Sequence, residues 1–327
     1  MPSQRTAARG LVSYADRFES VVANIARVIQ GKDEAIRLTL ICLLAEGHLL
    51  IEDVPGVGKT SLAKALAASL DVTWHRIQFT PDLLPSDVTG VVVYNRSNGS
   101  FDFRPGGIFA NVVLGDEINR ASPKTQSALL EAMEESQVTV DATTYRLTAP
   151  FMVIATQNPV EHEGTYPLPE SQLDRFLMRI EMGYPDRTAE ITMLDTHGGD
   201  GTIGDLAPVV RGAEVLAMVG VARDVHVAPV LKGYIVDLAN ATRRHPAIAL
   251  GISPRASLAL QRAARAMAAS VGREYVVPDD LKALAEPVLG HRLGLRPEAQ
   301  LGGLTATQVL SEVLASVPVP TGRPASA

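Results

Sequence analysis

A lysine and a threonine follow two closely spaced glycines in the segment 53–60, which reads DVPGVGKT. An apolar run precedes this segment and a helical pattern follows it, so it lies between a strand and a helix. Backbone N–H groups at Gly56 and Gly58 can approach phosphate oxygens there, and the helix dipole favours the anion. Lys59 can reach the β and γ phosphates, and the hydroxyl of Thr60 can ligate magnesium. The predicted phosphate-binding loop consists of Asp53, Val54, Pro55, Gly56, Val57, Gly58, Lys59, Thr60 and Ser61.

Asp53 departs from the generic form of such a loop. The pattern G-x-x-x-x-G-K-T has glycine at its first position, where this sequence has aspartate. On the pattern alone, a tight strand-to-helix turn that binds no ligand remains an alternative. The two acidic residues that follow a later strand favour the phosphate-binding interpretation.

Asp116 and Glu117 are adjacent carboxylates that come directly after the apolar run 112–115. In open α/β sheets, ligands bind at the carboxyl ends of the strands. We expect Asp116, together with Thr60, to hold a hydrated magnesium ion. We expect Glu117 to polarise a water molecule for in-line attack on a γ-phosphate. The alternative is a solvated acidic turn, which is less common directly after a buried strand.

Three further polar residues are candidates for the same site. Asn158 follows the third apolar strand, where its amide could orient the attacking water, although Asn-Pro alone indicates only a turn. Arg175 lies in Leu-Asp-Arg-Phe, and a local ion pair with Asp174 is its simplest interpretation. Arg255 falls in the first turn of a helix that Ser253 can cap. A cation there opposes the helix dipole, which suggests that it reaches outward to a nucleotide phosphate, the alternative being an incidental surface arginine.

Short apolar runs alternate with helical patterns through the first part of the chain. Fully apolar strands separated by helices are typical of a parallel sheet covered on both faces. Two alternating segments, 88–109 around Asn98-Gly99 and 137–147, predict β-hairpins inserted into this core. The predicted strands are 48–52, 74–79, 112–116, 151–156 and 177–181, and the first predicted helices are 18–29 and 33–45.

These patterns predict an α/β fold: a core with a parallel five-stranded sheet and β-hairpin inserts, followed by an all-α domain. Glycines concentrate at 197–204, helical stripes follow, and neither end of the chain shows periodicity. The expected divisions are a flexible tail over 1–15, a nucleotide-binding core over 16–197, a linker over 198–228, a helical domain over 229–316 and a flexible tail over 317–327.

The composition sets the broad class of protein. With 327 residues, of which 46% are hydrophobic and 20% charged, the chain suits about two globular domains. A formal net charge of −6 argues against a general nucleic-acid coat. The single cysteine, Cys42, cannot form an internal disulfide, and no Cys/His set has zinc spacing. His162 has acidic neighbours but is expected in a loop rather than a metal site. We expect a cytoplasmic protein without a membrane span.

The order of these segments resembles that of the AAA+ ATPases, and their particular sequences resemble the MoxR family. The resemblance covers about 15–314. Three stretches carry it: EDVPGVGKT at 52–60, DEINRASPKTQSALLEAMEESQVTV at 116–140 and FMVIATQNPVEHEGTYPLPESQLDRF at 151–176. An aspartate is usual in that family at the position of Asp53, which removes the objection raised by the generic pattern.

The resemblance implies properties that the residues alone do not show. Proteins of this family look like hexameric ring ATPases that bind ATP and Mg²⁺ between subunits, with Walker A at 53–60, Walker B at 112–117 and sensor 1 at Asn158. Arg175 would be the arginine finger given to the neighbouring subunit. Arg255 would be sensor 2 in a helical lid, serving either its own or the adjacent subunit. Members are thought to act as chaperone-like maturation factors for protein clients, alongside von Willebrand factor A domain partners.

Three alternatives remain at this point. The motor subunit of a magnesium or cobalt chelatase shares both hairpin inserts and would associate with a porphyrin-metallating core. A nucleotide-sensing scaffold would bind ATP as a switch without sustained turnover, although Glu117 and Asn158 argue against it. A DNA-remodelling AAA+ protein would show DNA-stimulated activity, which the acidic balance of charge disfavours.

Overall fold

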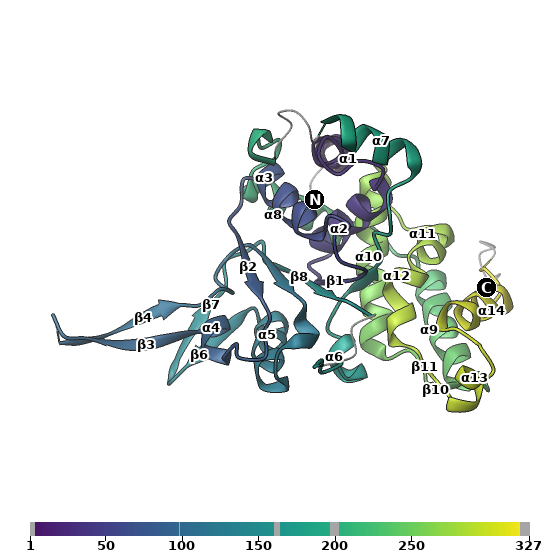
Figure 1. The fold of residues 1–327 in the computed structure, drawn as a ribbon. Helices are drawn as coiled ribbons and strands as arrows, with labels where there is room; N and C mark the ends of the chain where they lie inside the picture. Colours follow the sequence, from purple (N-terminus) through teal and green to yellow (C-terminus); the bar gives the residue numbers. More distant parts are fainter. Residues whose placement is uncertain (1–3, 98, 160–163, 197–202, 321–327) are drawn as a thin grey trace.

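Five parallel strands form the central sheet of the computed structural model, which describes residues 4–97, 99–159, 164–196 and 203–320 (Figure 1). The strand order is β2-β5-β8-β1-β9, and each neighbouring pair is parallel. The strands are β1 (Leu49–Glu52), β2 (Trp74–Gln78), β5 (Val112–Asp116), β8 (Met152–Gln157) and β9 (Met178–Ile180). The α/β class and the five predicted strands are therefore confirmed.

Side chains alternate between two hydrophobic layers along the central strands. On β5, Val112 and Leu114 belong to one layer and Val113 to the other. The first layer is covered by α1 (Gln4–Ala26), α2 (Asp33–Leu44) and α3 (Lys59–Ser69), and the second by α4 (Pro85–Thr89), η1 (Ile118–Arg120) and α5 (Pro123–Glu135). Because both faces are covered, polar side chains of the central strands gather where the strands end.

Two antiparallel hairpins are inserted into this core, as the sequence predicts. They pair β3 (Gly90–Asn95) with β4 (Ser100–Pro105), and β6 (Gln137–Val140) with β7 (Thr143–Arg146). The β3–β4 hairpin extends far from the body of the molecule (Figure 1). Phe103 stacks on Tyr145 with ring centroids 3.9 Å apart, which joins the two hairpins. Gly90 at the base has a φ of +96°, and a Cβ there would lie 2.5 Å from the carbonyl oxygen of Arg104.

The rest of the chain is mainly helical (Figure 1). Within it, α10 (Pro254–Ser270) packs against α2, and α12 (Ala285–Leu289) packs against β9. Ser253 caps α10, because its side chain accepts a hydrogen bond from the Ala256 N–H, as predicted. The all-α expectation needs one correction, since β10 (Ile248–Leu250) and β11 (Gly294–Leu295) form a short antiparallel ribbon. The elements are α6 (Glu170–Leu173), α7 (Arg187–Thr196), η2 (Ile203–Asp205), α8 (Gly212–Asp224), α9 (Pro229–Arg244), α10 (Pro254–Ser270), α11 (Pro278–Ala283), α12 (Ala285–Leu289), η3 (Gly290–Arg292), α13 (Pro297–Leu301) and α14 (Ala306–Ser316).

The flexible tail expected over 1–15 is helical from Gln4 onward, so this boundary is wrong. Leu11 and Tyr14 are buried and continue the apolar stripe of Phe18 toward the N-terminus. Their spacings of three and four residues were the available signal for a longer helix.

The linker expected over 198–228 needs a similar correction. It contains α8, whose Val215 and Met218 are buried in the same hydrophobic layer as the lid helices. Packing therefore fixes most of this segment in place. The glycine-rich part at 197–202 and the C-terminal stretch 321–327 lie outside the described residues.

His48 is a buried histidine that links β8 to α5. Its Nδ1 accepts a hydrogen bond from the Val153 N–H at 3.0 Å, so the proton of the neutral ring sits on Nε2. That Nε2–H donates to the carbonyl oxygen of Met133 at 2.9 Å. Burial lowers the pKa of His48 to about 4, because the charged ring would lose its hydration.

Acid should therefore destabilise the fold through His48. Between pH 6.5 and 4 the unfolded chain binds a proton that the folded chain excludes, so stability falls as pH falls, by up to about 3 kcal/mol over that window. We expect urea midpoints of the wild type to fall more steeply than those of His48→Gln between pH 7 and 4.5. Parallel curves for the two proteins would contradict this assignment.

Candidate functional site

The ends of β1, β5 and β8 open into one cavity of about 390 Å³. These three strands are neighbours in the sheet, with β8 between the other two. The structure thus brings together the glycine loop, the acid pair and the Asn-tipped strand, which are far apart in the sequence. The lining residues are Pro55, Gly56, Gly58, Lys59, Thr60, Ser61, Arg76, Asp116, Glu117 and Asn158.

The glycine loop has the shape of an anion cradle. Gly56 and Gly58 have φ values of +88° and +93°, which favour glycine. A Cβ on Gly56 would meet no atom within 4 Å, so open space lies beside the backbone. Gly58 precedes the first turn of α3 and offers no side-chain cap. The free N–H groups of that turn therefore point to an anionic ligand.

Asp53 anchors this loop to the segment that follows β9. One carboxylate oxygen accepts the Val54 N–H at 2.8 Å, and the other accepts the N–H groups of Met182 at 2.8 Å and Gly183 at 2.6 Å. The residue that departs from the generic pattern is thus a tether. Asp53, Val54 and Val57 belong to the predicted loop but are not among the cavity's lining residues.

Lys59 is half-buried beneath the cradle. Its Nζ donates to the carbonyl oxygen of Asp53 at 2.7 Å, which draws the loop around the ammonium. Burial lowers the pKa of Lys59, and the carboxylates of Asp53, Asp116 and Glu117 oppose that change. The charged lysine is therefore held between acids, where an incoming phosphate would add to its stabilisation.

The acid pair is oriented by Thr156 on β8. The hydroxyl of Thr156 donates to Asp116 Oδ1 at 2.6 Å and accepts the Glu117 N–H at 2.9 Å. Glu117 has φ +56° and ψ +50°, an uncommon conformation for a residue other than glycine. One fully buried hydroxyl therefore holds the carboxylate of Asp116 and the backbone of Glu117.

Cations and amides from neighbouring elements also hold the acid pair. Arg76 donates to Asp116 Oδ2 from Nη2 at 2.6 Å and from Nε at 3.1 Å. Glu117 Oε2 accepts from Gln78 Nε2 at 2.9 Å and pairs with Arg120 Nη1 at 3.1 Å. These three partners and Thr156 are not among the site residues predicted from the sequence.

The polar character of β2 was the signal that could have found Arg76 and Gln78. This edge strand lies beside β5, with Gln78 in register with Asp116. Trp74, His75 and Arg76 are exposed, whereas only Ile77 is buried on that strand. A polar strand next to an acid-tipped strand indicates side chains that serve a site.

Arg175 and Arg255 do not line this cavity. They lie together at α5, where Arg255 Nη2 is 3.0 Å from Glu134 Oε1 and Arg175 Nη2 is 3.4 Å from Glu134 Oε2. The local pair expected between Asp174 and Arg175 is replaced, because Asp174 pairs with Arg292 at 2.7 Å. The two arginines, which are far apart in the sequence, therefore meet at one carboxylate.

The residues at the cavity suit magnesium. Thr60 supplies a hydroxyl and Asp116 a carboxylate, both hard oxygen ligands at one lining. Within the described residues, no group of three or more His, Cys, Asp or Glu side chains could hold a metal by itself. Magnesium commonly takes one or two protein ligands and completes its shell with phosphate and water.

Comparison with known proteins identifies the family. A family model described as "ATPase family associated with various cellular activities (AAA)" matches residues 48–178, and one described as "AAA lid domain" matches residues 240–313. "Chaperone MoxR1" of Mycobacterium tuberculosis is 39% identical over 322 residues, 96% of this chain and 85% of that protein. This chain belongs to the MoxR family of AAA+ ATPases.

Two further similar proteins match nearly the whole chain. "Uncharacterized protein YeaC" of Bacillus subtilis is 51% identical over 304 residues, 93% of this chain and 95% of that protein. A crystal structure of a candidate ATPase from Cytophaga hutchinsonii has a TM-score of 0.91 at 39% identity, covering 97% of this chain and 99% of that one. The MoxR-family fold with its helical lid is thus shown. In the part of the chain that the structure describes, no helix is long and apolar enough to cross a membrane.

Removing the tether should destabilise the MoxR-family core. Asp53→Ala leaves three backbone N–H groups without their acceptor, at a cost of roughly 2 to 4 kcal/mol in the free energy of unfolding. Urea unfolding measures this loss. Asp237→Ala, at an exposed position of α9, is the matched control and should change stability little. Equal stabilities of the two variants would show that Asp53 does not anchor the loop.

Proposed function

We propose that this protein hydrolyses ATP to ADP and phosphate at a site completed by a second copy of the chain, and that the cycle drives chaperone-like remodelling of other proteins. The observation that carries the proposal is the cavity at the sheet edge. It gathers a phosphate loop, a magnesium-compatible oxygen pair and a glutamate beside an amide, while the two candidate phosphate-binding arginines lie outside it.

The polar groups at the cavity divide the tasks of this reaction between them. The loop N–H groups and Lys59 bind the β and γ phosphates. Thr60 and Asp116 hold Mg²⁺, which when bound neutralises negative charge on the phosphates. Glu117 accepts a proton from the attacking water, and Asn158 orients that water toward the γ-phosphate. The hydrogen bond from Gln78 to Glu117 fixes the carboxylate beside the cavity.

A second cavity, of about 530 Å³, is a suitable place for the nucleoside. It lies between the start of α2, the end of β9 and the lid helix α12. Met182 connects it to the phosphate loop, because this residue lines the cavity and donates its N–H to Asp53. We place the adenosine group of ATP here, next to its phosphates at Lys59.

The position of the two arginines supports a shared site. Both are held by Glu134 rather than by residues of the cavity in the same chain. In a head-to-tail ring, one face of each subunit contacts a different face of the next subunit. Each subunit can therefore supply arginines to its neighbour's site. We propose a homo-oligomeric ring, most simply a hexamer, with Arg175 as the finger and Arg255 as sensor 2.

The remodelling role rests on relatives. "Chaperone MoxR1" of Mycobacterium tuberculosis is named for such activity, and it matches nearly the whole of this chain. We extend a chaperone-like role to this protein and propose protein clients reached with a von Willebrand factor A domain partner in the cytoplasm. Co-purification of such a partner with the Glu117→Gln variant would support this part of the proposal.

Glu117→Gln should separate ATP binding from ATP hydrolysis. The amide cannot accept the proton of the attacking water, so turnover should fall at least about a hundredfold. The phosphate loop is unchanged, so affinity for ATP should stay within about twofold. Steady-state phosphate release and equilibrium binding of a fluorescent ATP analogue measure the two effects. Glu131→Gln on the exposed face of α5 is the control, and undiminished turnover in Glu117→Gln would remove Glu117 from its role.

Arg175→Ala should abolish turnover without preventing assembly. A finger supplied by a neighbour contributes about 10³ to 10⁵ in rate, and wild-type activity per chain should therefore rise with protein concentration as rings form. Phosphate release and light scattering on the same samples test both points, with Arg146→Ala on the exposed β7 as control. Activity that is absent, or indifferent to assembly and to Arg175, would favour a nucleotide-sensing scaffold.

A further inference from the structure

Arg292 is a buried cation where the lid meets the turn that carries Arg175. Only 3% of its side chain is exposed. Its Nε donates to Asp174 Oδ1 at 2.7 Å, and its Nη2 donates to the carbonyl oxygens of Asp174 at 3.1 Å and Phe176 at 2.6 Å. Its Nη1 donates to the carbonyl oxygen of Leu177 at 3.3 Å. One guanidinium thus fixes the backbone on both sides of Arg175.

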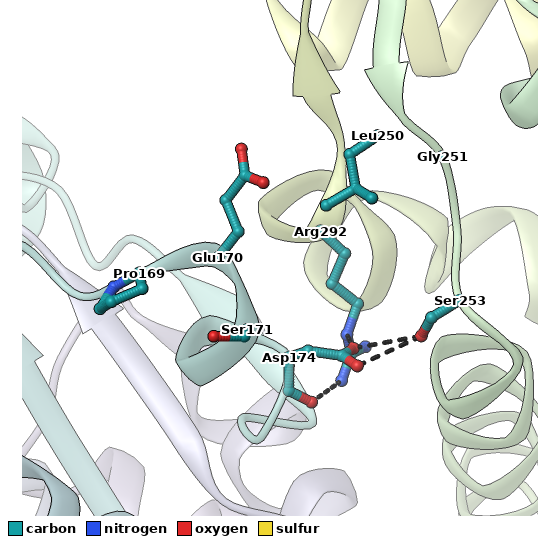
Figure 2. A pocket seen from close by; sticks show the side chains of 8 residues that line it. All are labelled: Pro169, Glu170, Ser171, Asp174, Leu250, Gly251, Ser253 and Arg292. Atoms are coloured by element: carbon teal, nitrogen blue, oxygen red, sulfur yellow. Dashed lines mark hydrogen bonds and ion pairs between the residues drawn. The ribbon is translucent and has the colours of Figure 1, made fainter.

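The same carboxylate reaches the helix that carries Arg255. Ser253 Oγ donates to Asp174 Oδ2 at 3.2 Å and accepts the Ala256 N–H at 3.1 Å as the cap of α10. Figure 2 shows Asp174 between Arg292 and Ser253, beside a cavity of about 400 Å³. Asp174 therefore joins the turn before β9 to the first turn of α10.

The arginines carried by these two elements point to one place. Arg175 and Arg255 each approach one oxygen of Glu134, within 3.4 Å and 3.0 Å. Two cations that share one carboxylate repel each other, so their positions depend on firm anchors behind them. The junction of Arg292, Asp174 and Ser253 supplies those anchors from both elements.

We propose that Arg292 is a positioning residue that, through Asp174, presents Arg175 and Arg255 as one preformed pair of cations to a triphosphate held by the next subunit. This inference rests on the proposed function and adds to it that the two arginines act as a unit set by the lid. A pair fixed before the reaction needs little rearrangement as charge develops on the γ-phosphate. A planar guanidinium holds a carboxylate and several carbonyls with five donors in a fixed fork, whereas an ammonium offers three donors and no fork.

Arg292→Lys tests the inference because lysine keeps the buried charge and loses the fork. We expect kcat to fall at least about tenfold, whereas the Kd for a fluorescent ATP analogue stays within about twofold because the variant's own loop is intact. Arg273→Lys is the matched control, since Arg273 forms a similar pair with the buried Asp280 elsewhere in the lid. A kcat for Arg292→Lys equal to that of the control would overturn the inference.

Mixed rings separate positioning from general damage. Arg292→Lys keeps its own loop and acids, and Glu117→Gln keeps its arginines. After random co-assembly, roughly a quarter of the interfaces join an intact loop to intact arginines. Turnover of the mixture should exceed the average of the two variants measured separately. A mixture whose turnover equals that average would show that Arg292→Lys damages its own site and would refute the inference.

A second variant covers the case in which Arg292→Lys does not fold. Ser253→Ala removes the link between α10 and Asp174, and Thr305→Ala, which removes the cap of α14, is its matched control. We expect kcat to fall several-fold more in Ser253→Ala than in Thr305→Ala, again at unchanged Kd. Equal effects would refute the inference.

If wild type and Arg175→Ala turn over ATP equally, the proposed function fails. If Arg175→Ala loses turnover but Arg292→Lys and Ser253→Ala behave as their controls, this inference alone fails.

Discussion

A parallel sheet buried on both faces is the constraint on which the site depends. Along β5 and β8 almost every side chain belongs to one of two hydrophobic layers, so the polar groups of these strands are confined to their ends. The order β5-β8-β1 then places the acid pair, the Asn-tipped strand and the glycine loop side by side. Thr156 can orient both acids because β8 lies directly beside β5. The candidate site residues therefore meet because of the way in which the strands pair.

The lid shares a hydrophobic layer with the core. Residues of α1, α2, β9 and α10 belong to one continuous cluster, and α8 fills the space that the sequence assigned to a linker. The lid is therefore packed against the strand that follows the Arg175 turn. Asp53 adds a second tie, since it binds the phosphate loop to the backbone directly after β9. The glycine loop, the turn that carries Arg175 and the lid are therefore linked through the two ends of β9.

The central sheet was predictable because apolar strands and the glycine loop are local patterns with distinct periods. The residues that surround the acids were less predictable from the sequence. Arg76 and Gln78 contact the acids only because β2 pairs with β5, and no local pattern reports which strands pair. Arg292 carries no motif, and its role depends on the meeting of the lid with a turn more than a hundred residues earlier. The N-terminal helix was missed for a different reason, since Leu11 and Tyr14 were available as a signal.

Every arginine around the site is matched to a carboxylate in this structure. Arg76 is paired with Asp116, Arg120 with Glu117, and Arg175 and Arg255 share Glu134. These carboxylates keep the cations oriented and partly desolvated before any phosphate arrives. A triphosphate carries more charge than one carboxylate, so it can replace these partners and gain interactions that are already aligned. Since Asp116 and Glu117 are also the residues that we propose for magnesium and the attacking water, phosphate binding would free them for hydrolysis by the same exchange of ion pairs. Arg175 and Arg255 share Glu134, so the same exchange applies to them. Both arginines would leave this one carboxylate together when they bind a phosphate held by the neighbouring subunit.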